Sequence, residues 1–318
     1  MYNNLNISRK GIAKRSLSIT CGIAALLIAV GCADNSKDAQ TTPQPSAAVE
    51  QSRNTADDPG AKGALNAGIQ AVKDTSSLEL TMALKQDITV DGETSSMTMK
   101  NSGSVVLEPL AVKQKTENDY MGEKSAVDSY LTSDGYYMYD PAAKAWSRML
   151  ADEVPKIKAT LSDFQIAPAK ELERIMPYAE SFRSSLSDGS LVLDYKGSGS
   201  DKAADALVRN LLRSTMGIDD MEARVRDSIK VSKLDYRLVF EEKTGMLKQL
   251  VADAEMTIEY DPGNPSTLKQ SLTIDYSKWN EAEPVIVPEE AKNAPEVMPL
   301  DQGLIDALGE EGLEEFNP

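Results

Sequence analysis

The chain of 318 residues has no histidine, and its two cysteines are Cys21 and Cys32. Without histidine, a Ser-His-Asp or Cys-His catalytic arrangement is excluded, and so is a histidine metal site. The usual acid–base group near neutral pH is missing for the same reason. No cysteine follows Cys32, so the rest of the chain has neither a disulfide nor thiol chemistry. We therefore predict that the protein is not an enzyme and holds no metal and no cofactor.

Positive charge is also scarce. The chain has 34 basic and 50 acidic residues, and its formal net charge is −16. Binding to nucleic acid requires a positive surface, and so does electrostatic attraction to anionic lipid. We expect no nucleic acid partner, and we expect any attachment to a membrane to depend on something other than surface charge.

The apolar run near the N-terminus is short. It begins near Leu17 and spans about 15 residues, fewer than the roughly 20 that a membrane-spanning helix needs. It follows a leader that contains Arg9, Lys10, Lys14 and Arg15 and no acidic residue. A basic region, a short apolar region and then small residues are typical of a secretory signal.

The small residues end in a cysteine, in the order Ala29-Val30-Gly31-Cys32. This segment resembles the lipobox of bacterial lipoproteins, although that motif usually has Leu where this chain has Ala29. The resemblance implies cleavage between Gly31 and Cys32 and an acyl chain such as palmitate on Cys32. Two interpretations remain as alternatives: an uncleaved signal anchor, and an ordinary secretory peptide with an incidental cysteine.

These features predict four parts of the chain. Residues 1–31 are a lipoprotein signal peptide, and residues 32–60 are a disordered polar tether. Residues 61–294 form the folded domain, and residues 295–318 are an acidic tail with a possible short helix. Each buried methylene of a lipid contributes about 0.8 kcal/mol to membrane binding, so two or more acyl chains give stable attachment. We expect the protein on the extracytoplasmic face of the cell membrane, held by lipid.

Apolar residues alternate with polar ones in two stretches that flank Asp91-Gly92. Alternation with a period of two predicts half-buried strands, and Asp-Gly favours a hairpin turn between them. The first stretch has its apolar residues at even positions and the second at odd positions: Leu78, Leu80, Met82, Leu84, Ile88 and Val90, then Met97, Met99, Val105 and Leu107.

Other segments complete a mixed pattern. Residues 61–73 read as a helix, and residues 151–218 contain helices, one of them with Ser200 as its N-cap. Short strands joined by turns precede this region up to residue 150, and strands return from residue 228. The first of these returning strands changes parity, which indicates a possible β-bulge. Residues 285–287 read as a terminal strand.

The same layout resembles the lipoprotein carriers of the LolA and LppX type. Residues 78–150 and 229–294 also look like a Gram-positive lipoprotein family of unknown function. The likeness lies in three segments: Met82-Ala-Leu-Lys-Gln-Asp-Ile-Thr-Val-Asp-Gly, Tyr130-Leu-Thr-Ser-Asp-Gly-Tyr-Tyr-Met-Tyr-Asp, and Asn280-Glu-Ala-Glu-Pro-Val-Ile-Val-Pro-Glu-Glu-Ala-Lys-Asn-Ala. The resemblance implies an α+β fold in which a long, curved antiparallel sheet forms a half-barrel. Helices would pack on its concave face beside a cavity for acyl chains.

Two groups of residues are candidates for a binding site. The apolar row on the first two strands either lines a hydrophobic pocket, for which adaptable methionine is suited, or belongs to a filled core. The aromatic group Tyr136, Tyr137, Tyr139 and Trp146 either forms a mouth for headgroups or packs across strands. The predicted ligand-binding residues are Leu78, Leu80, Met82, Leu84, Met97 and Met99.

The sequence thus favours a membrane-anchored extracytoplasmic lipoprotein that binds or carries a hydrophobic or amphiphilic ligand. The alternative is a non-catalytic structural or interaction module that docks another protein of the cell envelope. The sequence identifies neither the ligand nor a protein partner.

Overall fold

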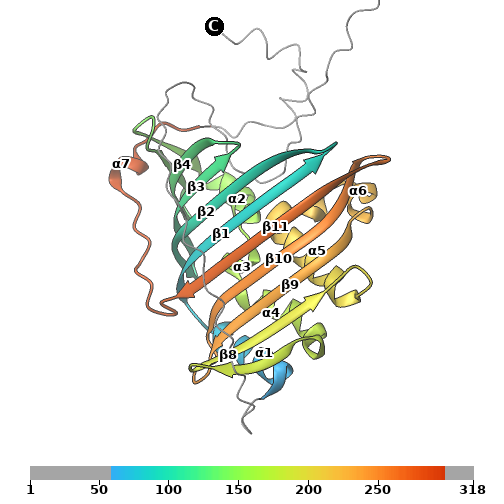
Figure 1. Ribbon diagram of the computed structural model, residues 1–318. Helices are drawn as coiled ribbons and strands as arrows, with labels where there is room; N and C mark the ends of the chain where they lie inside the picture. Colours follow the sequence, from blue (N-terminus) through green and yellow to red (C-terminus); the bar gives the residue numbers. More distant parts are fainter. Residues whose placement is uncertain (1–58, 298–318) are drawn as a thin grey trace, which may run out of the picture.

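The protein is an α+β fold built on one antiparallel sheet of eleven strands (Figure 1). This computed structural model describes residues 59–297. The strand order is β6-β5-β4-β3-β2-β1-β11-β10-β9-β8-β7, and the edge strands β6 and β7 do not pair with each other. The sheet is therefore an open half-barrel, as predicted. The expected signal peptide, most of the tether and nearly all of the acidic tail lie outside the described residues.

The strands run in chain order along the two halves of the sheet. Their bounds are β1 (Ser77–Val90), β2 (Glu93–Leu107), β3 (Leu110–Tyr120), β4 (Glu123–Thr132), β5 (Gly135–Asp140), β6 (Ala145–Leu150), β7 (Arg183–Ser187), β8 (Ser190–Gly197), β9 (Lys230–Glu241), β10 (Leu247–Asp261) and β11 (Asn264–Ser277).

Most of the helical segments lie between β6 and β9 in the chain. The α-helices are α1 (Gly60–Lys73), α2 (Val154–Thr160), α3 (Asp163–Ile166), α4 (Pro168–Ile175), α5 (Lys202–Met216), α6 (Ala223–Asp227) and α7 (Glu289–Lys292). Short 3₁₀ turns are η1 (Ala151–Glu153), η2 (Met176–Ser181) and η3 (Ile218–Asp220). In Figure 1 the helices α1 to α6 lie behind the sheet, against its concave face. Helix α7 is separate from them and lies at the left of the view, beside β4. Within residues 59–297, no helix combines the length and the apolar character needed to cross a membrane.

The predicted alternation places the apolar residues of β1 and β2 on the concave face. Met82 of β1 lies opposite Asn101 of β2 and Ile274 of β11, so the inward positions of three strands form one row. Leu78 and Leu84 are almost completely buried there. Period-two patterns put alternate residues on one face, and here that face packs against helices and is removed from water.

Helices α1 and α5 cover the half of the sheet formed by β8 to β11. Leu65 and Val72 of α1 and Leu207 and Leu211 of α5 are buried in the main core. Gly68 lets α1 approach the sheet closely, because a Cβ at this position would overlap the ring of Phe240. This half of the molecule is therefore a filled core of helices on a sheet.

Local details both confirm and correct the predictions. The β-bulge in β9 is confirmed, because Lys233 and Val231 pair with the adjacent residues Glu255 and Met256 of β10. The N-cap of α5 is Asp201, whose side chain accepts a hydrogen bond from the Ala203 backbone N–H. The prediction of Ser200 as the cap was one residue early, and strand β7 was not predicted.

The predicted terminal strand at residues 285–287 is wrong. These residues have no strand structure, and the chain then forms α7. Pro284 and Pro288 flank the segment, and proline cannot donate a ladder hydrogen bond. Beyond α7, a single parallel bridge joins Glu296 to Arg148 on the edge strand β6.

Candidate ligand-binding cavity

A cavity of about 490 Å³ lies between the concave face of the other half of the sheet and the helical region. Small-molecule sites typically occupy about 300–1,000 Å³. Strands β1 to β5 form one wall, and α2, α3 and the end of α5 form the opposite wall. The strands contribute Met82, Leu84, Met99, Asn101, Val112, Gln114, Thr116, Ser129, Leu131 and Tyr136. The helical side contributes Ile157, Ala159, Thr160, Leu161, Ser162, Asp163, Gln165, Arg213, Ser214, Thr215, Gly217 and Asp220.

Three of the six predicted ligand-binding residues lie on the wall of this cavity. Met82, Leu84 and Met99 occupy neighbouring inward positions, since Leu84 lies directly opposite Met99. Leu78 and Leu80 are buried in the core nearer the other end of β1, and Met97 packs against the core. The structure therefore separates the predicted row into a cavity part and a core part. A role of any of the six in ligand binding stays a prediction.

The strand wall also carries a group of side-chain amides. Asn101 Nδ2 donates to Gln114 Oε1 at 3.1 Å, and Gln165 Nε2 donates to the same oxygen at 3.4 Å. Gln165 belongs to the capping box of α3, in which its Oε1 accepts from the Ser162 backbone N–H at 3.1 Å. This amide group, Asn101, Gln114 and Gln165, thus joins the start of α3 to strands β2 and β3.

Asn101 is only 5% exposed, and its Oδ1 has no hydrogen-bond partner within the described chain. Leaving one buried polar atom unpaired costs about 1–3 kcal/mol. Gln114 is half-buried, and no described residue accepts a hydrogen bond from its Nε2.

A second polar row reaches the cavity from the neighbouring strands. Gln86 Nε2 donates to Gln270 Oε1 at 2.7 Å, and Gln270 Nε2 donates to Thr215 Oγ1 at 3.2 Å. The Thr215 hydroxyl in turn donates to the Leu211 carbonyl at 2.9 Å. Gln86 and Gln270 are each 2% exposed. A chain of hydrogen bonds therefore runs from Gln86 through Gln270 to Thr215, which lines the cavity.

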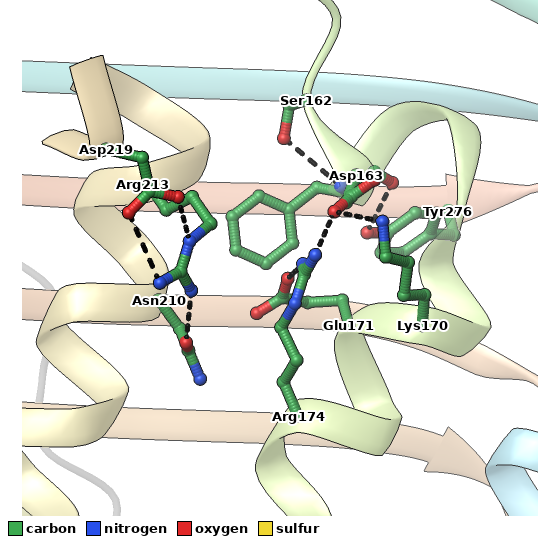
Figure 2. A network of polar contacts seen from close by, with 10 residues as sticks. Ser162, Asp163, Lys170, Glu171, Arg174, Asn210, Arg213, Asp219 and Tyr276 are labelled. Atoms are coloured by element: carbon green, nitrogen blue, oxygen red, sulfur yellow. Dashed lines mark hydrogen bonds and ion pairs between the residues drawn. The ribbon is translucent and has the colours of Figure 1, made fainter. Parts of the chain in front are cut away.

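Charged side chains at the helical wall are engaged with one another (Figure 2). Asp163, which lines the cavity, contacts Arg174 through a short ion pair and Lys170 Nζ at 3.3 Å. Arg174 Nη1 donates to Glu171 Oε2 at 2.9 Å. Tyr276 lies beside this group, and its hydroxyl donates to the Phe164 carbonyl.

Arg213 of α5 forms a separate ion pair with Asp219 of η3. Its Nε donates to Asp219 Oδ2 at 2.6 Å, and its Nη1 donates to Asn210 Oδ1 at 2.8 Å. The Arg213 guanidinium lowers the pKa of the Asp219 carboxyl through this hydrogen bond, so the pair stays charged near neutral pH. The one arginine of the cavity wall is thus already paired, while Asp163 and Asp220 add negative charge.

The structure divides the predicted aromatic group between the two faces of the sheet. Tyr136 lines the cavity, and burial raises the pKa of its hydroxyl, which hydrogen-bonds Ser129. Tyr139 and Trp146 pack together elsewhere, with ring centroids 5.1 Å apart. Tyr137 forms a second small cluster with Val287 and Ala291 of the C-terminal segment. The aromatic residues other than Tyr136 pack across strands and against this segment.

The polar wall was not predicted, although the sequence contains a signal for it. Asn101 has the same odd parity as Met97, Met99 and Val105, and Gln86 has the even parity of Leu84. A polar residue at an inward position of a half-buried strand needs a partner or a ligand. The burial of Glu171 was also not predicted. Glu173, two residues further along the same helix, is exposed, and only the tertiary structure buries Glu171.

Within residues 59–297, no three acidic, histidine or cysteine residues are grouped so that they could hold a metal ion. The cavity combines an apolar strand wall, uncharged amides and paired charges. Such a site can bury the apolar part of a ligand and hydrogen-bond a polar part.

Comparison with protein families gives one match. The model of a family of unknown function, DUF6612, matches residues 61–296. No curated protein matches the chain.

Several solved structures are similar in fold. LprF from Mycobacterium bovis has 11% identity and a TM-score of 0.33, over 73% of this chain and 97% of that one. A putative outer membrane lipoprotein-sorting protein domain from Vibrio parahaemolyticus has 11% identity and a TM-score of 0.23, over 72% and 98%. A Pseudomonas aeruginosa MucA/MucB complex has 12% identity and a TM-score of 0.22, over 72% and 62%. Similarities this low carry no argument about function.

Proposed function

This chain belongs to the DUF6612 family of unknown function, and we propose that it binds or carries a hydrophobic or amphiphilic molecule in the cavity beside β1 to β5. The observation that carries the proposal is the cavity itself. It has a volume of about 490 Å³, and Met82, Leu84 and Met99 line it beside Val112 and Leu131.

Burial of apolar ligand surface would supply the affinity. Each Å² of apolar surface removed from water contributes about 25 cal/mol before the costs of ordering the ligand are subtracted. Methionine side chains at two wall positions adapt to ligands of different shape. The role is non-catalytic in this proposal, because the chain after Cys32 lacks both histidine and cysteine.

We also propose that Cys32 carries the lipid that holds the protein at the extracytoplasmic face of the cell membrane. The lipobox-like Ala29-Val30-Gly31-Cys32 supports this, together with the polar residues that follow it. Cleavage would occur between Gly31 and Cys32, and residues 32–60 would act as the tether. We further propose that the protein comes from a Gram-positive bacterium, as its resemblance to a Gram-positive lipoprotein family implies.

The binding proposal is tested with the full-length protein purified from membranes. Native mass spectrometry and organic extraction would separate a non-covalent ligand from an acyl chain attached to Cys32. We expect a co-purified apolar or amphiphilic molecule. Ala159 is exposed at the helical wall of the cavity, so Ala159→Trp would obstruct the site without changing the core.

The expected effect of Ala159→Trp is at least a tenfold loss of ligand occupancy, which corresponds to about 1.4 kcal/mol. The matched control is Lys158→Trp, an exposed neighbour that does not line the cavity. A protein that purifies without ligand and binds no uncharged apolar dye would contradict the proposal. Equal occupancy in both variants would show that the ligand lies elsewhere.

A docking role is the second candidate, and one feature favours it. Tyr120 and Met121, at the turn between β3 and β4, are 51% and 64% exposed. Large apolar side chains at a hairpin tip are suited to a protein contact. This candidate would be favoured by a pulldown that recovers one envelope protein in stoichiometric amount. Met121→Ser should abolish that recovery, and the purified protein should hold no ligand in its cavity.

A further inference from the structure

The amide group beside the cavity carries a further inference, which rests on the proposed function. We infer that Asn101 and Gln114 select an uncharged ligand whose polar part has both a hydrogen-bond donor and an acceptor, such as a hydroxyl or a carboxamide. The ligand class is therefore a neutral amphiphile, with its apolar part against Met82, Leu84 and Met99.

The side-chain amides of Asn101 and Gln114 do not use all of their hydrogen-bonding capacity within the protein. Gln114 Oε1 already accepts from Asn101 and from Gln165, so what remains of this side chain is its Nε2 donor. Asn101 Nδ2 gives one of its two N–H groups to Gln114, and its Oδ1 is the unused acceptor. Amide donors and one acceptor thus remain on adjacent strands, and together they are the complement of a group that both donates and accepts.

A ligand in the cavity has access to both amides. Both side chains line the cavity, and Gln114 is half-buried. The Asn101 oxygen is shielded from solvent, but χ2 of asparagine is a broad torsion, so the amide can turn toward a ligand group. Gly103 lies between Leu80 and Gln114 in the same cross-strand row, so no side chain from that position covers the amides.

The charges of the cavity wall disfavour charged headgroups. An anionic headgroup would find no unpaired cation on the wall, because Arg213 is paired with Asp219, and it would be repelled by the other charged wall residues, Asp163 and Asp220. A cationic headgroup would meet Asp163 already paired with Arg174 and Lys170, and Asp220 is exposed to solvent, where an ion pair contributes little. Along the strand wall, the polar lining residues are amides and hydroxyls. Hydrogen bonding to neutral groups is therefore the specificity that this wall offers.

The test uses four ligands with similar alkyl chains and different polar groups. Dodecanamide donates and accepts, methyl dodecanoate only accepts, dodecanoate is anionic, and dodecyltrimethylammonium is cationic. Each displaces an uncharged apolar dye from the full-length protein. We expect dodecanamide to bind at least tenfold more tightly than each of the other three.

Two variants remove the amides, and a third is the control. Asn101→Leu removes the unused acceptor and should reduce the preference for dodecanamide over methyl dodecanoate to less than threefold, with methyl dodecanoate bound as before. Gln114→Leu removes the donor and should weaken dodecanamide and methyl dodecanoate alike, because both accept a hydrogen bond. Because Gln114 is half-buried, Gln114→Leu keeps the test valid if Asn101→Leu fails to fold. Gln249→Leu removes an amide that contacts Asp275 at an exposed site, and it should retain the full preference.

The outcomes distinguish this inference from the proposed function. Dye binding without preference among the four ligands, a preference that survives Asn101→Leu, or undiminished binding of both ligands to Gln114→Leu overturns the inference and leaves the proposed function intact. Tighter binding of either charged ligand also overturns the inference alone. Failure of the dye and of every ligand to bind would overturn the proposed function and the inference together.

Discussion

At the scale of single residues, Glu171 is the most unusual side chain of the described chain. It is 2% exposed, its Oε2 accepts from Arg174 at 2.9 Å, and its Oε1 has no partner among the described residues. Burial raises the pKa of this carboxyl, and the hydrogen bond with Arg174 opposes the shift. A raised pKa in the folded state means that the folded protein binds more protons than the unfolded chain between the two pKa values. Stability therefore falls as pH rises through that range.

Glu171→Gln removes this dependence on pH. We expect the wild type to lose stability relative to the variant as the pH is raised from about 5 to about 7, because only the wild type then ionises a buried group. Urea unfolding of both proteins at the two pH values measures the difference. Glu173→Gln is the control on the same helix, since Glu173 is exposed, and it should leave the wild-type slope unchanged. A slope of the opposite sign in the wild type, or the same slope in Glu171→Gln, would contradict this assignment.

At the scale of elements, the segment after β11 is held on the sheet by few but specific contacts. The Arg148 backbone N–H donates to the Pro295 carbonyl at 3.0 Å, and the Val297 N–H donates to the Arg148 carbonyl at 2.8 Å. Ala291 of α7 is completely buried against Tyr137. The segment thereby covers the edge strand β6, whose backbone groups would otherwise be open to pairing with another chain.

Ala291→Asp should release this segment. A carboxylate buried without a partner is costly, and we expect a loss of about 1–3 kcal/mol in the free energy of unfolding of this region. Trypsin cleavage after Lys292 is the measurement, and it should become at least tenfold faster, because about 1.4 kcal/mol changes the open fraction tenfold. Glu290→Ala, at the exposed neighbouring position, should cleave at the wild-type rate. Unchanged cleavage of Ala291→Asp would show that the backbone contacts alone hold the segment.

At the scale of the whole molecule, the two halves of the sheet serve different purposes. Helices α1 and α5 fill the concave face of β8 to β11, whereas β1 to β5 face the cavity across α2 and α3. The described domain begins with α1, which follows directly from the tether proposed for residues 32–60. A lipid on Cys32 would then tether the domain, with its cavity, to the extracytoplasmic face of the membrane.

Cys32→Ala tests the attachment. We expect the variant to lack covalent lipid and to move from the membrane fraction to the aqueous fraction, because the acyl chains supply the affinity for the bilayer. Fractionation and mass spectrometry of the N-terminal peptide measure both effects. Cys21→Ala, in the part of the leader that cleavage would remove, is the control and should remain in the membrane. Membrane attachment of Cys32→Ala equal to that of the wild type would contradict the lipid anchor.

The sequence by itself determined most of the elements, β7 excepted, and the inward face of the long strands. A period of two between Leu78 and Leu84 allows one side of a strand to be apolar, and the Asp91-Gly92 turn then sets the partner and its register. It did not determine the C-terminal segment, where Val285 to Val287 have the composition of a strand, because pairing there depends on an edge that only the folded sheet presents.

Only the tertiary structure decided which part of the apolar row adjoins a cavity. Leu80 and Met82 have the same parity and the same chemistry, yet Met82 lines the cavity and Leu80 is buried in the core. Both residues belong to β1, so the difference arises along the strand, from how closely the helical segments approach each part of it. Helix placement depends on long-range contacts such as Gly68 against Phe240. For the same reason, only the tertiary structure decided that the inward amides of Asn101 and Gln114 lie beside Gln165 and line the cavity.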